Sequence, residues 1–130
     1  MKRGDIVTVA LQGDYGKPRP ALVIESDRLP ATEGVLICLI TSTVHEDTRF
    51  RRHAVDASPS TGLRVLFHVM VDKIFAVRRT KCGPHIGELD AAAMLAVSRK
   101  LALLTGIADC AQSGRYHNRS VSWHRPTVWN

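Results

Sequence analysis

A chain of 130 residues with 45% hydrophobic and 23% charged side chains has the size and composition of one globular domain. These values exclude a collagen-like repeat, a coiled coil and wholesale disorder, and no apolar run reaches the ~18–20 residues of a bilayer-spanning helix. Because the N-terminus lacks the apolar region of a secretory signal, we expect a cytoplasmic protein.

The charge balance points to a polyanionic partner. Lys and Arg number 18 against 12 Asp and Glu, which gives a net charge of +6. A small basic domain has nucleic acid as its first expected partner. A basic surface that is simply solvated is the alternative, and composition alone does not separate the two.

Apolar and β-branched runs in the first part of the chain predict strands. Residues 35–41 are apolar throughout, which favours burial on both faces of a sheet. Residues 50–56 alternate in the manner of a one-sided edge strand. The last run is long for one strand, and Asp72 and Lys73 within it predict a bend or bulge. The predicted strands are residues 6–11, 21–25 (opened by Pro20), 35–41, 50–56 and 65–77.

One amphipathic helix is expected after the strands, over residues 91–104. Asp90 is a suitable N-cap, and Gly106 is a suitable residue just beyond the C-terminus. An apolar stripe at helical spacing predicts one face of the helix, which we expect to contact the core or a second copy of the chain: Met94, Val97, Leu101 and Leu104. Five or six strands and one helix indicate a mainly β protein with a C-terminal helix (α+β), with a strongly bent sheet or barrel closed on one side by the helix.

The cysteines and histidines form no metal-binding motif. The three cysteines are far apart and lack the paired spacing of zinc sites, and the six histidines lack helical pairing. We therefore expect no metal and no cofactor. Cys38 lies in an apolar strand and is expected in the core, whereas Cys82, beside Lys81 and near His85, is expected to be an incidental surface thiol.

A stronger constellation surrounds Arg19. The segment Gly-Lys-Pro-Arg-Pro, residues 16–20, ends a loop where a strand begins, and the flanking prolines restrict the backbone that carries the arginine. A guanidinium offers paired donors that suit a phosphate or a developing phosphorane. Thr41, Ser42 and Thr43 end a later strand and offer hydroxyl groups. An arginine tied to a structural carboxylate is the alternative.

Several segments resemble the MazF/PemK family of toxin endoribonucleases in order and spacing. They cover residues 2 to about 106, so we divide the chain into a toxin-like domain, residues 1–106, and an unassigned extension, residues 107–130, whose order or disorder stays open. The matching segments are residues 2–7, 16–24, 39–43, 62–64 and 69–73.

The resemblance implies an SH3-like β-barrel of the PemK/CcdB type that forms a homodimer. It implies the toxin of a type II toxin–antitoxin system: a sequence-specific endoribonuclease that cuts single-stranded RNA without a metal and is neutralised by a cognate antitoxin. Cleavage by the ribose 2′-OH would leave a 2′,3′-cyclic phosphate and a 5′-OH end. Arg19 and Thr41 match the family's catalytic positions, and Ser42 and Asp72 match positions that often line the site.

The sequence departs from common family patterns at three positions. Met70 stands where some relatives carry an arginine, two residues before the acidic position. Phe67 replaces a small polar residue and His68 replaces an amide. His68 is therefore either a titratable base near neutral pH or a histidine on an outer strand face.

Basic, hydroxyl and aromatic side chains outside these motifs are candidates for RNA contacts. Basic stretches at residues 49–52 and 78–81 would track phosphates, or else form a solvated face. Tyr15 would stack on a base or pack against its own loop. The candidate RNA-binding residues are Asp14, Tyr15, Lys17, Thr43, Arg51 and Lys73.

Two further functions remain open on the same fold. One is a non-enzymatic toxin that inhibits DNA gyrase, and the other is a nucleic-acid-binding module without catalytic activity. Arg19 together with Thr41 favours the ribonuclease, because a gyrase inhibitor has no need of that pair. Fold alone does not separate the three functions.

Overall fold

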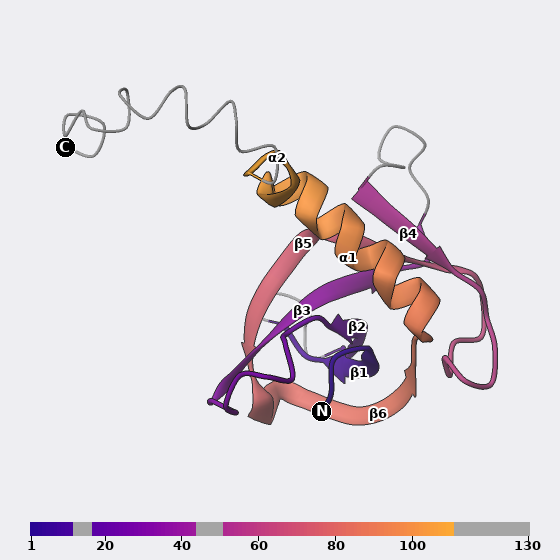
Figure 1. Ribbon diagram of the computed structural model, residues 1–130. Helices are drawn as coiled ribbons and strands as arrows, with labels where there is room; N and C mark the ends of the chain where they lie inside the picture. The colour runs from indigo at the N-terminus through magenta and orange to yellow at the C-terminus, as the bar shows by residue number, and fades with distance from the viewer. Residues whose placement is uncertain (12–16, 44–50, 111–130) are drawn as a thin grey trace, which may run out of the picture.

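The computed structural model describes residues 1–11, 17–43 and 51–110. This part of the chain forms one antiparallel six-stranded sheet and a C-terminal helix, followed by a single helical turn (Figure 1). The strands are β1 (Asp5–Val9), β2 (Arg19–Val23), β3 (Gly34–Thr41), β4 (Arg52–Val55), β5 (Phe67–Arg78) and β6 (Cys82–Glu88). A 3-10 turn, η2 (Arg79–Lys81), joins β5 to β6, and the helices are α1 (Ala91–Thr105) and α2 (Ile107–Cys110).

The sheet has the strand order β4-β5-β3-β2-β1-β6 and curls strongly, because β5 and β6 arc around β1 and β2 (Figure 1). The curl has a local cause in β5. Cys38 of β3 pairs with Ile74, whereas Ile40 pairs with Val69, so the single residue Leu39 faces residues 70–73. Extra residues on one strand bend it and increase its twist. The bend predicted at Asp72 and Lys73 is therefore confirmed.

Helix α1 begins and ends as its sequence predicts. The Asp90 carboxylate accepts a hydrogen bond from the N–H of Ala93 (2.7 Å), and Gly106 has a φ of 81°, the left-handed conformation that ends many helices. Val97 is fully buried, and Met94 and Leu101 pack against the same core. Leu104, the last residue of the stripe, is 37% exposed, because the core beneath α1 extends along the helix only as far as Leu101. A contact with a second copy of the chain stays a prediction for this residue.

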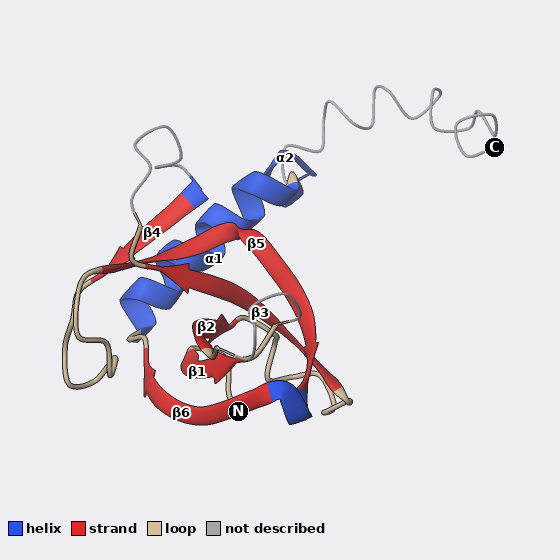
Figure 2. Ribbon diagram, turned by 180° about the vertical axis from the view of Figure 1, so that it is seen from behind, coloured by secondary structure: helices blue, strands red, loops and turns tan. Residues whose placement is uncertain are grey.

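Two apolar clusters lie on the two sides of the sheet. The first faces α1 and contains Val97 of the helix together with Leu22 and Ile40 of the sheet. The second faces away from α1 and contains the residues that alternate with these along the strands, such as Ala21 beside Leu22 and Leu39 beside Ile40. Figure 2 shows from behind that α1 covers one side of the sheet only. Residues 35–41 of β3 are thus buried on both faces as predicted, apart from Leu36, which is 40% exposed, and Thr41, which is half-buried.

Strand β6 has no counterpart among the predicted strands. Its sequence, Cys-Gly-Pro-His-Ile-Gly-Glu, has two glycines and a proline, which normally argue against a strand. Pro84 is tolerated because β6 is an edge strand. Gly87 allows a close approach, since a Cβ there would lie 2.3 Å from the backbone of Thr61. This strand therefore forms because it packs closely against a neighbouring loop, and not because of the strand propensity of its residues.

The boundaries of the five predicted strands differ from the prediction by one or two residues at one end or both. Strand β1 ends at Val9 rather than at Leu11. Strand β2 begins at Arg19, so the arginine belongs to the sheet and not to the preceding loop. Strand β4 is an edge strand as predicted, but Phe50, where it was expected to begin, lies outside the described residues. Neither helix of the described chain is long and apolar enough to cross a membrane.

Candidate active site

Arg19 and Thr41 lie opposite each other at the same end of the sheet. Ala21 of β2 pairs with Leu39 of β3, and Leu22 pairs with Cys38. The same register, continued by two residues, places Arg19 opposite Thr41. Directly opposite residues of adjacent strands point to the same side and lie about 5 Å apart. Two residues that the sequence places far apart thus become neighbours.

The row of residues continues across two more strands. Thr41 pairs with His68 of β5, and His68 pairs with Ala54 of β4. Three of these strands carry an apolar residue two positions away from the row: Ala21 on β2, Leu39 on β3 and Met70 on β5. These apolar residues belong to the cluster that faces away from α1. Because alternate residues of a strand share a side, Arg19, Thr41 and His68 also lie on that side. We call these three residues the polar row.

Thr41 has a defined hydroxyl geometry. Its Oγ1 accepts a hydrogen bond from the N–H of Thr43 (3.1 Å), which turns the chain at the end of β3. A hydroxyl that accepts from one partner still carries its own proton, which it can donate to a phosphate oxygen. Ser42 and Thr43 are exposed beside it.

His68 is half-buried, and its Nε2 is completely covered. Among the described residues this atom has no hydrogen-bond partner. A buried polar atom without a partner is costly in a folded protein and calls for an explanation, such as a ligand that completes the site. The half-buried ring and the buried Nε2 disfavour an outer strand face for this histidine. Its catalytic role stays a prediction.

Asp72 lies in the bulge of β5 and forms an ion pair with Arg52 of β4. The distance from Arg52 Nη1 to Asp72 Oδ1 is 3.6 Å, and the two side chains are 11% and 20% exposed. Arg52 is also the cross-strand partner of Met70. Sequence reasoning placed Arg52 only in a basic stretch and did not single it out. The register between β4 and β5 is what shows that Arg52 lies beside Met70.

Four of the six predicted RNA-binding residues lie in the described part of the chain, and all four are on its surface. Lys17, Thr43, Arg51 and Lys73 are exposed, and Lys73 lies in the bulge of β5. Asp14 and Tyr15 lie outside the described residues. Lys17 precedes Arg19 by two residues and Thr43 follows Thr41 by two, so both flank the polar row in the sequence.

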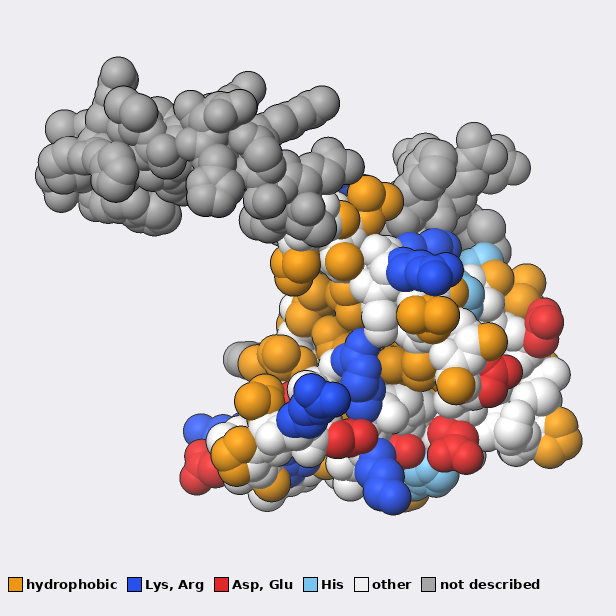
Figure 3. Space-filling view, viewed as in Figure 1, with side chains coloured by type: hydrophobic (Ala, Val, Ile, Leu, Met, Phe, Trp, Pro, Cys, Tyr) orange, Lys and Arg blue, Asp and Glu red, His pale blue; other side chains and the backbone are white. Residues whose placement is uncertain are grey.

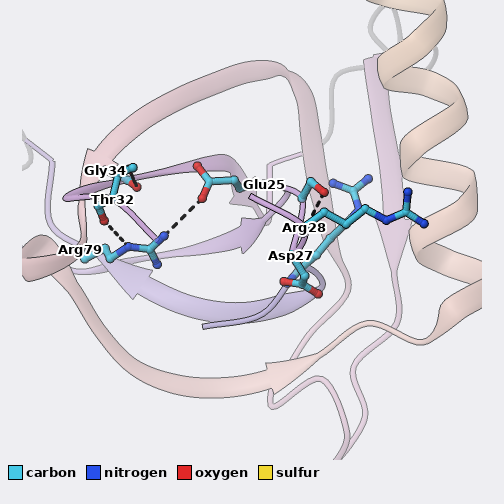
Figure 4. A network of polar contacts seen from close by, with 8 residues as sticks. Glu25, Asp27, Arg28, Thr32, Gly34 and Arg79 are labelled. Carbon is cyan, nitrogen blue, oxygen red and sulfur yellow. Dashed lines mark hydrogen bonds and ion pairs between the residues drawn. The ribbon is translucent and has the colours of Figure 1, made fainter. Parts of the chain in front are cut away.

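The second basic stretch, residues 78–81, contains a residue with a structural role. Arg79 donates from Nε to the carbonyl oxygen of Thr32 (2.6 Å) and pairs through Nη2 with Glu25 Oε2 (3.2 Å) (Figure 4). Its backbone N–H donates to the carbonyl oxygen of Glu33 (2.7 Å). The side chain therefore fixes the loop between β2 and β3, a structural role that the prediction for this basic stretch did not include.

The two thiols that the structure describes are poorly suited to nucleophilic chemistry. Cys38 is fully buried, and burial is the main reason why its pKa is raised to about 12. The nearby charge of Asp72 adds to this effect. Burial also raises the pKa of the half-buried Cys82. Both remain protonated thiols at neutral pH, and the thiolate is the reactive form.

A group that could hold a metal ion lies away from the polar row. Ligand atoms of Asp5, His85 and Glu88 lie within 4.8 Å of one another, and His85 Nε2 is 3.5 Å from Asp5 Oδ1. Asp5 begins β1, whereas Val9, the neighbour of Arg19, ends it. The group therefore belongs to the opposite end of the strand, and the contact between His85 and Asp5 already involves two of its members.

Comparison with known proteins decides the family. Residues 2–105 match the model of the PemK-like, MazF-like toxins of type II toxin–antitoxin systems. The chain belongs to this family. A "Probable endoribonuclease MazF" of Mycolicibacterium smegmatis (strain ATCC 700084 / mc(2)155) is 38% identical over 109 residues, which make up 83% of this chain and 99% of the relative. The chain is an endoribonuclease of the MazF type, as the resemblance predicts.

Solved structures of MazF toxins have the same fold. An endoribonuclease from a mycobacterial species, in complex with its cognate antitoxin, superposes with a TM-score of 0.68 at 23% identity and covers 82% of this chain and 95% of its own. The MazE–MazF complex of Deinococcus radiodurans gives a TM-score of 0.64 at 22% identity, with coverages of 82% and 95%. The predicted mainly β fold with a C-terminal helix is confirmed.

Proposed function

We propose that this MazF-type endoribonuclease is a sequence-specific, metal-independent enzyme for single-stranded RNA. The observation that carries the proposal is the polar row, in which Arg19, Thr41 and His68 share one side of the sheet on three adjacent strands. The row supplies a fixed cation, a hydroxyl donor and a titratable nitrogen within about two strand spacings, or ~10 Å. RNA cleavage without a metal needs these three kinds of group.

Each residue has a distinct chemical task. The ribose 2′-OH attacks the adjacent phosphorus, the bond to the 5′ oxygen breaks, and the products are a 2′,3′-cyclic phosphate and a 5′-OH end. Arg19 stabilises the negative charge of the phosphorane and is the candidate to protonate the 5′ oxygen as it leaves. Thr41 donates a hydrogen bond to a phosphate oxygen. His68 is a candidate to take the 2′-OH proton when its ring is neutral. Ser42 and Asp72 line the site.

The partners follow from charge and from the exposed apolar side chains. Figure 3 shows hydrophobic side chains gathered beside α1. Leu95 is 53% exposed, Leu103 is 58% exposed and Ile107 is 65% exposed. Exposed apolar clusters of this kind mark interfaces, and we assign this one to a homodimer. With a net charge of +6, the protein also suits an acidic antitoxin segment that folds on binding and covers Arg19.

The decisive experiment is incubation of the purified protein with a long single-stranded RNA in EDTA, with the ends mapped by primer extension. We expect discrete cuts with 5′-OH ends, and no cuts with Arg19→Ala or Thr41→Ala. Arg28→Ala is the matched control, because Arg28 is an exposed arginine of the loop after β2.

The alternatives give a different result in the same assay. Intact RNA, with protein shown to be folded and free of antitoxin, would favour a gyrase inhibitor or a binding module without activity. Full cleavage by Arg19→Ala or Thr41→Ala would refute the residue assignment and leave the ribonuclease. Loss of cutting in EDTA would refute the metal-independent mechanism.

A further inference from the structure

Arg52 and Asp72 form a largely buried charge pair next to the polar row. Arg52 begins the edge strand β4 and pairs across the ladder with Met70, which is two residues from His68 on β5. Asp72 lies in the bulge of the same strand. The pair is 11% and 20% exposed, so solvent screens it only in part.

The pair is held by charge attraction rather than by a hydrogen bond. Its N–O distance of 3.6 Å exceeds the ~2.7–3.2 Å of an N–H···O hydrogen bond. Asp72 Oδ1 has no hydrogen-bond partner in the part of the chain that the structure describes. Removing one member of a buried pair leaves the other charge uncompensated, which costs far more than the pair itself contributes. Without Arg52, the negative charge of Asp72 would therefore be left uncompensated.

The backbone beneath Arg52 is also fixed. Lys100 Nζ of α1 donates a hydrogen bond to the carbonyl oxygen of Arg52. The guanidinium thus extends toward the bulge from a strand whose backbone contacts the helix. Arg52 joins the edge strand, the bulge and the helix at one point.

The position of Asp72 matters for an anionic substrate. Strand spacing and the register of His68 with Thr41 place the carboxylate on the order of 10 Å from a phosphate held by the polar row, about one Debye length at physiological salt. An uncompensated carboxylate at this distance, in partly buried surroundings, repels the phosphate. Asp72 can therefore line the site without weakening RNA binding only if the charge of its carboxylate is cancelled.

We propose that Arg52 is a positioning residue that acts through Asp72. It cancels the carboxylate charge beside the RNA phosphate and holds the bulge of β5 against β4, and it does not itself contact the RNA. The proposal rests on the proposed ribonuclease function and assigns a role to a residue outside the polar row.

The test compares Arg52→Met, Asp72→Asn, the double variant and Arg52→Lys on the RNA that the wild type cuts. We expect Arg52→Met to lose about tenfold in kcat/KM. The loss should come mainly from a higher KM, because the uncompensated Asp72 carboxylate repels the RNA phosphate. Asp72→Asn added to Arg52→Met should restore most of the loss, since no carboxylate then remains. Arg52→Lys should keep most of the activity. Arg28→Met is the control for the loss of one positive charge from the surface.

A binding measurement separates positioning from direct contact. The probe is the same RNA with a 2′-deoxy residue at the cut, titrated at several salt concentrations. Each phosphate contact to a single strand contributes about −0.7 to the slope of log K against log salt. We expect the slope of Arg52→Met to equal that of the wild type.

Two outcomes overturn the proposal. A double variant as poor as Arg52→Met, with a salt slope smaller in magnitude by about 0.7, would show that Arg52 binds a phosphate directly. Unchanged kcat/KM for Arg52→Met would show that the pair has no role at the site. Both outcomes leave the ribonuclease intact, whereas a wild type that cuts no RNA refutes the proposed function itself.

Discussion

Thr41 and His68 are direct cross-strand partners, although they lie in different segments of the sequence and on different strands. Their side chains therefore share one side of the sheet and lie about 5 Å apart. His68, which replaces an amide of the family pattern, is therefore a neighbour of the proposed catalytic hydroxyl of Thr41.

The first prediction concerns this histidine. His68→Gln keeps a polar side chain of similar size but removes the titratable nitrogen, and we expect kcat to fall about 100-fold, the lower range of a general-base contribution. His85→Gln is the control, since His85 is exposed on β6. If His68→Gln keeps the wild-type kcat, His68 only lines the site.

How much of this site was predictable depends on the residue. Arg19 and Thr41 are recognisable because each belongs to a short motif of unusual composition, namely an arginine between prolines and a run of three hydroxyl residues. Local sequence also predicts the cap at Asp90 and the bend at Asp72. These features depend on neighbouring residues, which a sequence displays directly.

Arg52 and strand β6 were not predictable in the same way. The role of Arg52 depends on its register with Met70, and a shift by one residue would turn its side chain to the other side of the sheet. Strand β6 has a composition that disfavours strands, and it forms because β1 and the loop around Thr61 pack against it. Both depend on contacts between distant segments, about which local propensity says nothing.

A second prediction concerns stability at acidic pH. His53 of β4 pairs with Val69 on the side that faces α1, and burial lowers its pKa below the usual 6.5, with the charge of Lys100 adding to the effect. The unfolded chain therefore takes up the proton first as the pH falls below about 6.5. The stabilising contribution of neutral His53 is present above that pH and is lost as the pH falls toward the lowered pKa.

The measurement is urea unfolding of wild type and His53→Gln at pH values from neutral to mildly acidic. We expect the free energy of unfolding of the wild type to fall more steeply below pH 6.5 than that of the variant. Parallel curves for the two proteins would show that His53 has the same pKa in the folded and unfolded states.

A third prediction uses the thiols. In a Cys110→Ser background, a disulfide reagent should modify Cys82 slowly in the native protein and Cys38 only after unfolding. The reason is that Cys38 is fully buried with a pKa of about 12, whereas Cys82 is half-buried. Mass spectrometry of the native reaction identifies the modified residue. Native labelling of Cys38 as fast as Cys82 would contradict the burial of β3.

The last prediction tests the strand that the sequence does not reveal. Gly87→Ala places a Cβ 2.3 Å from the backbone of Thr61, which cannot move like the end of a flexible side chain. We expect a loss of about 1–3 kcal/mol in the free energy of unfolding, the usual cost of overpacking. Gly34→Ala is the matched control, because its Cβ would meet nothing closer than 3.7 Å. Equal stability of the two variants, measured by denaturant unfolding, would mean that β6 does not pack against the Thr61 loop as closely as this contact requires.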